Sequence, residues 1–312
     1  MIPRTIRIGT RSSPLAMWQA RRVAESLHRV HAGAGLVVDL VEIKTLGDRD
    51  RDAPLAAIGG AGVFTKEIQR ALLDGSVDVA VHSLKDLPTK SVNGLTLAAV
   101  PEREDLADAL ISPRHQTIER LPPRAKVGTG SPRRRAQLLH LRPDLEIVAI
   151  RGNVETRLAH AWEGRLDAIV LAIAGLRRLG LDVHVTQRLE PPEFLPAVGQ
   201  GALGIECRAD DVSNLSLLSR LECGEARSAV EAERQALAGL EGSCLIALGA
   251  WGRVLSRDIL ALDVEVFDLD GRERLRVGLE GNREAPDVLG GEVAQRLREL
   301  GAERLLRAGR SP

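Results

Sequence analysis

Two stretches of this chain place the same kinds of residue in the same order. Thr5-Ile6-Arg7-Ile8-Gly9 has the β-branched, alternating character of a strand, and Thr10 to Pro14 leads from it into a helical pattern from Leu15 to about Val30. Residues 126–132 repeat the strand, Gly-Thr, Ser-Pro and helix order. Serine caps a helix, and proline suits the first turn, where its missing N–H costs nothing. The repetition predicts two similar α/β domains.

A second repetition follows the first in the same order. Residues 75–81 and 164–170 both run from a glycine through an aspartate into an apolar strand. Chance likeness between strand–turn–helix segments is the competing explanation. The length of 312 residues exceeds what one hydrophobic core usually fills, which favours several domains.

Two polar, proline-containing segments, 101–105 and 191–201, are expected to be the places where the chain crosses between domains. Beyond Glu222 the pattern changes to alternating stretches, which are typical of an antiparallel sheet. These stretches are 246–255, 259–267 and 272–279, with helices expected at about 225–240 and 286–300. The predicted domains are 1–101 with 201–220 (α/β, with a returning strand at 202–207), 106–195 (α/β) and 223–312 (α+β).

The strand at 77–81 leads directly into a short polar tip that carries Lys85 and Asp86. Asp86 is the only carboxylate between Asp78 and Glu102. Ligands of open α/β sheets collect beyond the carboxyl ends of strands, so Asp86 is a candidate site residue. A solvated loop that merely ends a strand is the alternative. For His82, beside this tip, a hydrogen-bonded structural role is the alternative to a role in the site.

Positive charge is concentrated in one part of a chain that is neutral as a whole. Lys+Arg and Asp+Glu both total 43, but residues 120–180 contain 12 Lys or Arg and five Asp or Glu. Cations near a helix N-terminus oppose the helix dipole, so several arginines there indicate a bound anion, such as a carboxylate or phosphate. A solvated basic face is the alternative. The arginines concerned are Arg11, Arg133, Arg134, Arg135, Arg151, Arg157, Arg177 and Arg178.

The three cysteines are too widely spaced for a disulfide framework or a zinc site. Cys244 lies in a Gly-Ser turn after a predicted helix, which suits a nucleophile or an attachment point; an inert, small apolar side chain is the alternative. Cys207 lies in an apolar strand and is expected in the core, whereas Cys223 gives no clear signal.

Several functional classes are disfavoured by composition and motifs. With no Tyr and three each of Phe and Trp, the chain lacks the stacked aromatics of many nucleic-acid modules. It contains no Walker-type loop and no Gly-x-Ser-x-Gly motif. The N-terminal residues lack the apolar run of a signal peptide, and no window approaches 18 apolar residues, so we expect a cytoplasmic protein without a membrane partner. The Gly-rich stretch 44–62 is expected to be a mobile lid.

Six motifs together resemble the porphobilinogen deaminase (hydroxymethylbilane synthase) family, in the family's order and over nearly the whole chain. They are Gly9–Ala16, Val81–Pro88, Gly128–Arg134, Arg151–Val154, Leu195–Ala202 and Leu240–Cys244. The resemblance implies two doubly wound, periplasmic-binding-protein-like α/β domains around a cleft, plus a C-terminal α+β domain with an antiparallel sheet. It implies a monomeric transferase of tetrapyrrole (haem) biosynthesis. Such an enzyme condenses four porphobilinogen molecules head to tail into hydroxymethylbilane and releases ammonia.

The resemblance also implies residue roles. Asp86 matches the catalytic carboxylate, and Cys244 matches the residue that holds a dipyrromethane cofactor through a thioether. The positions that match cofactor-binding residues are Ser83, Lys85, Asp86, Thr129, Ser131, Arg133 and Arg134. The positions that match substrate-binding residues are Arg11, Ser13, Phe64, Arg151, Arg157, Arg178 and Gln200. No metal and no nucleic acid are expected.

The chain departs from the family pattern at three positions. Ala57 and Ala61 stand where many members carry Lys, and Ala247 stands where Pro is usual, which puts efficiency in doubt more than reaction type. Two other classes compete with the enzyme. A non-catalytic small-anion binding protein would use the same two-domain cleft but would not need Cys244 or a third domain. A DNA-binding regulator would need a helix-turn-helix, and none precedes the first strand.

Overall fold

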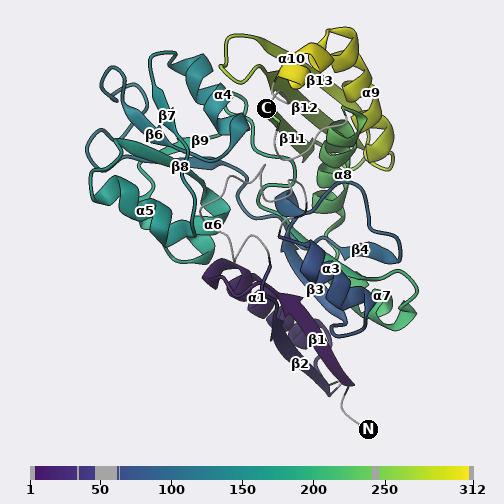
Figure 1. Cartoon of the computed structure of the whole chain (residues 1–312). Helices are drawn as coiled ribbons and strands as arrows, with labels where there is room; N and C mark the ends of the chain where they lie inside the picture. Colours follow the sequence, from purple (N-terminus) through teal and green to yellow (C-terminus); the bar gives the residue numbers. More distant parts are fainter. Residues whose placement is uncertain (1–3, 34, 46–61, 63, 241–245, 309–312) are drawn as a thin grey trace. The chain divides into compact units, whose positions relative to one another are not determined.

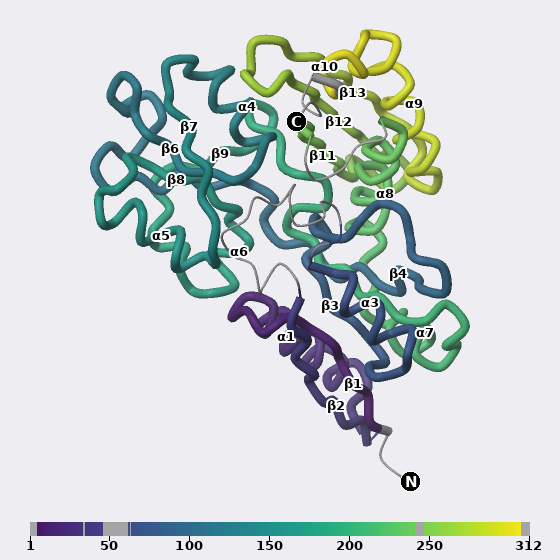
Figure 2. Tube along the Cα trace, in the orientation of Figure 1, coloured from purple at the N-terminus to yellow at the C-terminus, as the bar shows by residue number. Residues whose placement is uncertain are grey.

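The computed structural model describes residues 4–33, 35–45, 62, 64–240 and 246–308 (Figures 1 and 2). The chain divides into two compact units. The first comprises Met1–Arg103 and Ala202–Arg227, and the second comprises Glu104–Gly201 and Ser228–Pro312. None of the described helices is both long and apolar enough to span a membrane.

The first unit is built on a five-stranded sheet in the order β2-β1-β3-β10-β4. β1 pairs in parallel with β2 and β3, whereas β10 pairs antiparallel with β3 and β4. The strands are β1 (Arg4–Thr10), β2 (Leu36–Glu42), β3 (Val79–Ser83), β4 (Leu95–Ala99) and β10 (Leu203–Arg208). The helical elements are α1 (Pro14–Val30), α3 (Lys66–Leu73), η1 (Leu84–Asp86), α7 (Val212–Leu218) and η3 (Ser219–Leu221).

Helices α1 and α3 pack against opposite faces of this sheet. α1 buries residues at helical spacing, and Ala20, Val23 and Leu27 share one apolar cluster with Val79 and Val81 of β3. Ile68 and Leu72 of α3 share a different cluster with Ala80. Successive strand residues point to opposite faces, so the next residue on the side of Ala80, His82, belongs to the α3 face.

The second unit contains a sheet with the same arrangement, in the order β7-β6-β8-β5-β9. β6 pairs in parallel with β7 and β8, and β5 pairs antiparallel with β8 and β9. The strands are β5 (Asp108–Ile111), β6 (Lys126–Gly128), β7 (Glu146–Val148), β8 (Ala168–Ala172) and β9 (Gln187–Leu189). The helical elements are α4 (Pro132–Leu141), α5 (Val154–Trp162), α6 (Ile173–Arg178) and η2 (Asp182–His184).

The two sequence repetitions occupy equivalent places in the two sheets. Asp78 Oδ2 accepts a hydrogen bond from the backbone N–H of Arg7 at 2.9 Å, and Asp167 Oδ2 accepts one from the backbone N–H of Lys126 at 2.7 Å. Each aspartate therefore ties the start of its own strand to the neighbouring parallel strand. The predicted pair of similar α/β folds is confirmed.

The second unit also contains a three-stranded antiparallel sheet in the order β11-β12-β13. Its strands are β11 (Leu248–Val254), β12 (Ile259–Phe267) and β13 (Arg274–Asn282). The helices of this part are α9 (Pro286–Glu299), α10 (Ala302–Ala308) and α8 (Gly224–Gly239), of which the first four residues belong to the first unit. Leu260 and Leu262 of β12 form one cluster with Val293 and Leu297 of α9. The predicted antiparallel sheet is confirmed.

Some boundaries differ from expectation. The strand expected at 77–81 is β3, which begins at Val79 and extends through Ser83. The short strands β4, β5, β7 and β9 were not predicted, because three to five residues give too little alternation to recognise. The division into three domains stays a prediction. Cys244 and almost all of the stretch 44–62 lie outside the described residues.

Candidate active site

The polar tip after β3 is held firmly by the backbone. The N–H of Leu84 donates to the carbonyl of Ala202 at 3.0 Å, and the N–H of Leu87 closes the 3-10 turn on Leu84 at 3.1 Å. Leu84 and Leu87 are buried, whereas Lys85 and Asp86 are partly exposed. The tip therefore presents its carboxylate from a fixed backbone at the carboxyl end of the strand.

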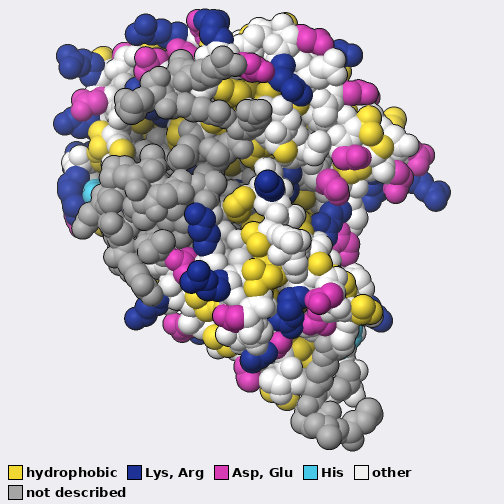
Figure 3. All heavy atoms as spheres, turned by 45° about the vertical axis from the view of Figure 1, so that its right-hand side comes forward, with side chains coloured by type: hydrophobic (Ala, Val, Ile, Leu, Met, Phe, Trp, Pro, Cys, Tyr) yellow, Lys and Arg dark blue, Asp and Glu magenta, His cyan; other side chains and the backbone are white. Residues whose placement is uncertain are grey.

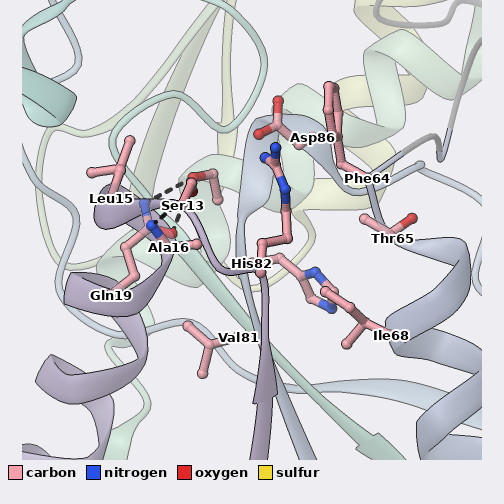
Figure 4. A pocket seen from close by; sticks show the side chains of 12 residues that line it. Ser13, Leu15, Ala16, Gln19, Phe64, Thr65, Ile68, Val81, His82 and Asp86 are labelled. Atoms are coloured by element: carbon pink, nitrogen blue, oxygen red, sulfur yellow. Dashed lines mark hydrogen bonds between the residues drawn. The ribbon is translucent and has the colours of Figure 1, made fainter. Parts of the chain in front are cut away.

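Asp86 lines a pocket of about 70 Å³ that lies within the first unit. Figure 4 shows Ser13, Leu15 and Gln19 on one side of this pocket and Phe64, Thr65 and Ile68 on the other, with Asp86 and His82 between them. Five of its lining residues were predicted site residues: Arg11, Ser13, Phe64, Ser83 and Asp86. The sequence did not indicate Gln19.

Arg11 and Phe64 lie together in this pocket. The guanidinium carbon of Arg11 is 4.2 Å from the centroid of the Phe64 ring, which is a cation–π contact. The pair combines a flat apolar surface with a positive charge.

Helix α1 positions two further pocket residues. Ser13 is its N-cap, and Oγ of Ser13 accepts from the backbone N–H of Ala16 at 3.3 Å. The side chains of Gln19 and Ser83 exchange hydrogen bonds, at 2.8 Å from Gln19 Nε2 to Ser83 Oγ and 3.3 Å from Ser83 Oγ to Gln19 Oε1. Helix α1 is thereby linked to the end of β3.

His82 is buried behind the pocket beside an acid. Its Nε2 lies 3.0 Å from Glu206 Oε2, and both side chains are almost fully buried. This is an ion-pair distance, although Nε2 makes no hydrogen bond of good geometry to any of the described residues. Gln69 Nε2 donates to both oxygens of Glu206, at 3.3 and 3.1 Å.

The other predicted residues belong to the second unit, where Thr129 and Ser131 form the start of α4. Oγ of Ser131 accepts from the backbone N–H of Arg134 at 3.4 Å, and the N–H of Ser131 donates to Oγ1 of Thr129 at 3.2 Å. Ser131 is thus the predicted N-cap, with Pro132 in the first turn.

Arg133 and Arg134 are not open cations at this helix start, contrary to the expectation that they need a bound anion. Arg133 Nη1 lies 2.7 Å from Asp108 Oδ2, and Arg134 Nη2 lies 2.7 Å from Asp108 Oδ1. Burial acts to raise the pKa of Asp108, but the two guanidinium groups outweigh burial and hold it well below its usual range. Gln200 Nε2 also donates to Asp108, at 2.9 Å. The chain itself supplies the anion.

Several of the other arginines of residues 120–180 are also paired within the chain. Arg135 contacts Asp270 at 3.1 Å, Arg142 contacts Asp144 at 2.8 Å and Arg177 contacts Glu104 at 3.1 Å. On the face drawn in Figure 3, Lys and Arg side chains are interspersed with Asp and Glu. These pairs leave fewer arginines for a ligand than the sequence indicates.

Three further predicted site residues of the second unit are Arg151, Arg157 and Arg178. Nη1 of Arg151 is buried and has no hydrogen-bond partner among the described residues. Arg157 Nε donates to the carbonyl of Gly152 at 2.9 Å, and Arg178 Nη2 donates to the carbonyl of Gly201 at 2.7 Å. Burial lowers the pKa of Arg178 to about 10, against the opposing effect of Glu104.

Two family models match the chain. "Porphobilinogen deaminase, dipyromethane cofactor binding domain" matches residues 6–216, and "Porphobilinogen deaminase, C-terminal domain" matches residues 228–299. The chain belongs to the porphobilinogen deaminase family. The first of these models is named for the domain that binds a dipyrromethane cofactor, which is the cofactor expected from the sequence.

Curated porphobilinogen deaminases match nearly the full length. The chain is 48% identical over 302 residues to the enzyme of Xanthomonas campestris pv. campestris (strain B100), covering 97% of this chain and 98% of that one. It is 47% identical over 299 residues to the enzyme of Nitratidesulfovibrio vulgaris (strain DP4), covering 96% and 95%.

Solved structures that match only distantly are also found. A periplasmic substrate-binding protein of an ABC transporter from Coxiella burnetii has a TM-score of 0.45 and 16% identity, covering 73% of this chain and 96% of that one. A periplasmic binding protein from Salmonella typhimurium has a TM-score of 0.39 and 14% identity, covering 70% and 91%.

Proposed function

We propose that this chain is a porphobilinogen deaminase. It condenses four porphobilinogen molecules head to tail into hydroxymethylbilane, with release of ammonia, in tetrapyrrole biosynthesis. One observation carries the proposal. A single pocket brings Asp86 together with Arg11 and Phe64, in a chain that matches both halves of the family.

Asp86 is assigned the catalytic role. Loss of ammonia from the aminomethyl group of porphobilinogen leaves an electron-poor methylene-pyrrolenine cation, whose charge is shared with the pyrrole N–H. A carboxylate fixed beside that N–H stabilises the cation as it forms. The hydrogen bond from Leu84 to Ala202 holds the tip in place, so that little reorganisation is needed during the reaction.

Arg11, Ser13 and Phe64 are assigned to the substrate. Each porphobilinogen carries two carboxylates, and a guanidinium group binds a carboxylate through two parallel hydrogen bonds. Arg11 stacks on Phe64 at 4.2 Å, which supports a site where the pyrrole ring packs near Phe64 and a carboxylate pairs with Arg11. The same substrate role is proposed for Arg151, Arg157, Arg178 and Gln200.

A polyacidic cofactor is proposed to bind a further group of the predicted residues. The buried, unsatisfied Nη1 of Arg151 is the kind of donor that a ligand carboxylate satisfies. When bound, dipyrromethane supplies the tethered end from which the product chain grows. We assign its attachment to Cys244 and its further contacts to Ser83, Lys85, Asp86, Thr129 and Ser131. Cofactor contacts are likewise proposed for Arg133 and Arg134, which also support α4 through Asp108.

Turnover with defined stoichiometry tests the proposal. The purified protein, incubated with porphobilinogen, should release four ammonia molecules for each hydroxymethylbilane formed. A small-anion binding protein would retain porphobilinogen without releasing ammonia, and that result would refute the proposal.

We further propose a cytoplasmic monomer that binds neither nucleic acid nor membrane. Light scattering during size-exclusion chromatography measures the molar mass and so tests the oligomeric state.

A further inference from the structure

His82 combines two properties that the role of Asp86 leaves unexplained. It lines the same pocket as Asp86, and it is paired with a buried acid, Glu206. The pair lies on the α3 face of the sheet, because His82 follows Ala80 on that side and Gln69 of α3 contacts Glu206. Burying polar side chains without full hydrogen bonding costs free energy, so the buried position of His82 and Glu206 calls for an explanation.

The two nitrogens of the His82 ring have different surroundings. Nε2 is fully buried and faces Glu206. Nδ1 has no hydrogen-bond partner among the described residues and is not one of their fully buried polar atoms, so it is the nitrogen that is open to the pocket. An imidazole nitrogen on the pocket side, with a carboxylate oxygen 3.0 Å from the other ring nitrogen, supplies the elements of a general base.

Gln69 keeps the carboxylate of Glu206 hydrogen-bonded whichever charge the His82 imidazole carries. Its amide donates to both oxygens of Glu206, so this buried carboxylate is hydrogen-bonded even while His82 is neutral. When His82 gains a proton, the carboxylate 3.0 Å away stabilises the imidazolium. The charged groups that line the pocket with His82 are Arg11 and Asp86.

The reaction releases a proton that needs such a base. In every condensation after the first, the acceptor pyrrole derives from an earlier substrate molecule and carries a hydrogen on the ring carbon that is alkylated. A carbon–carbon bond forms between this carbon and the methylene carbon of the deaminated substrate. The C–H bond then breaks, its electron pair restores the aromatic ring, and a proton is released.

We propose that His82 is a further catalytic residue, the base whose Nδ1 accepts this proton, with Glu206 and Gln69 as positioning residues behind it. The imidazolium passes the proton to the ammonia released in the same cycle, which leaves as ammonium, and neutral His82 is restored. Asp86 keeps its separate role of stabilising the cation. The inference rests on the proposed deaminase activity.

The experiment uses the cofactor-loaded protein and porphobilinogen deuterated at its free ring α-carbon. His82→Asn is expected to lower kcat about 100-fold or more while KM, the cofactor mass increment and Tm stay near those of the parent. The primary deuterium isotope effect on kcat should increase, because proton removal becomes the slow step. Glu206→Gln should show the same increase with a smaller loss, about tenfold.

The isotope effect separates catalysis from structure. His31→Asn is the matched control, because His31 lies in the same unit, contacts the carbonyl of Leu217 at 3.0 Å and does not line the pocket. Near-normal kcat in His82→Asn, or a loss with an unchanged isotope effect, overturns the inference. If His82→Asn does not fold, Glu206→Gln decides on the same criterion. A parent protein that releases no ammonia would instead refute the deaminase proposal itself.

Discussion

Arg134 and Asp108 form a buried ion pair in which Nε and Nη2 of the arginine lie 3.0 and 2.7 Å from the same carboxylate oxygen, Oδ1. Arg133 contacts the other oxygen at 2.7 Å. The three side chains are almost completely buried. One carboxylate therefore balances two guanidinium groups inside the second unit, and the start of α4 depends on it.

Asp108→Asn is expected to destabilise the protein by about 3–5 kcal/mol, because it leaves two buried guanidinium groups without a compensating charge. Urea unfolding at neutral pH measures the change. Since the two arginines lower the folded-state pKa of Asp108, its contribution is present above the ordinary pKa of an aspartate and is lost as the pH falls.

Asp270→Asn is the matched control for this prediction. It removes an equivalent carboxylate from Arg135, but both members of that pair are substantially exposed, so the expected cost is at most about 1 kcal/mol. Equal losses from the two substitutions would contradict the assigned importance of burial.

Glu265 is expected to make stability fall as the pH rises. Its side chain is fully buried in β12, both carboxylate oxygens lack hydrogen-bond partners among the described residues, and burial raises its pKa to about 7. Between the ordinary pKa of a glutamate and about 7, the folded protein holds a proton that the unfolded chain has released. The stabilisation is therefore complete below that ordinary pKa and is lost as the pH rises through about 7.

Glu265→Gln should remove this pH dependence. As the pH rises from about 5 to 8, the unfolding free energy of the variant is expected to increase by about 2–3 kcal/mol relative to that of the parent. Urea unfolding at the two pH values measures the difference. Glu280→Gln, at an exposed position on the neighbouring strand β13, serves as the control and should follow the parent at both. Parallel pH profiles for Glu265→Gln and the parent would rule the effect out.

Asp86→Asn should nearly abolish turnover while leaving Tm unchanged. The substitution preserves shape but removes the charge that stabilises the cationic intermediate, and loss of one such preorganised group typically costs at least about 100-fold in rate. Release of ammonia from porphobilinogen is the measurement. Asp210→Asn, an exposed carboxylate of the same unit, should behave like the parent. Near-normal activity of the Asp86 variant would remove this residue from the mechanism.

Cys244→Ser should prevent covalent attachment of the cofactor. The intact mass of the purified parent is expected to exceed its sequence mass by two linked pyrrole units, and the variant should show the sequence mass alone. Cys223→Ser should retain the added mass. Cys207 is a poorer control, because it is buried in β10 and burial raises its thiol pKa to about 11. Added mass in the Cys244 variant would place the attachment elsewhere.

The site was predictable where it follows from local order. Ser13 and Ser131 cap helices because serine oxygens accept the free N–H groups of a first turn, and both are followed by proline. Asp86 was predictable because an apolar strand leads straight into it. The partners of Arg133 and Arg134 were not predictable, because Asp108 lies on a four-residue strand that was not predicted and is 25 or more residues away in sequence.

The sequence by itself determined the two repeated α/β folds, the antiparallel sheet and the candidate carboxylate, because strand and helix periodicity and capping are properties of neighbouring residues. Only the tertiary structure decided which charges are available to a ligand. Strand pairing brings His82 against Glu206, and helix packing brings Arg134 against Asp108, across separations that no local pattern encodes. Whether a charged side chain binds substrate or supports the fold depends on which distant groups share its buried surroundings.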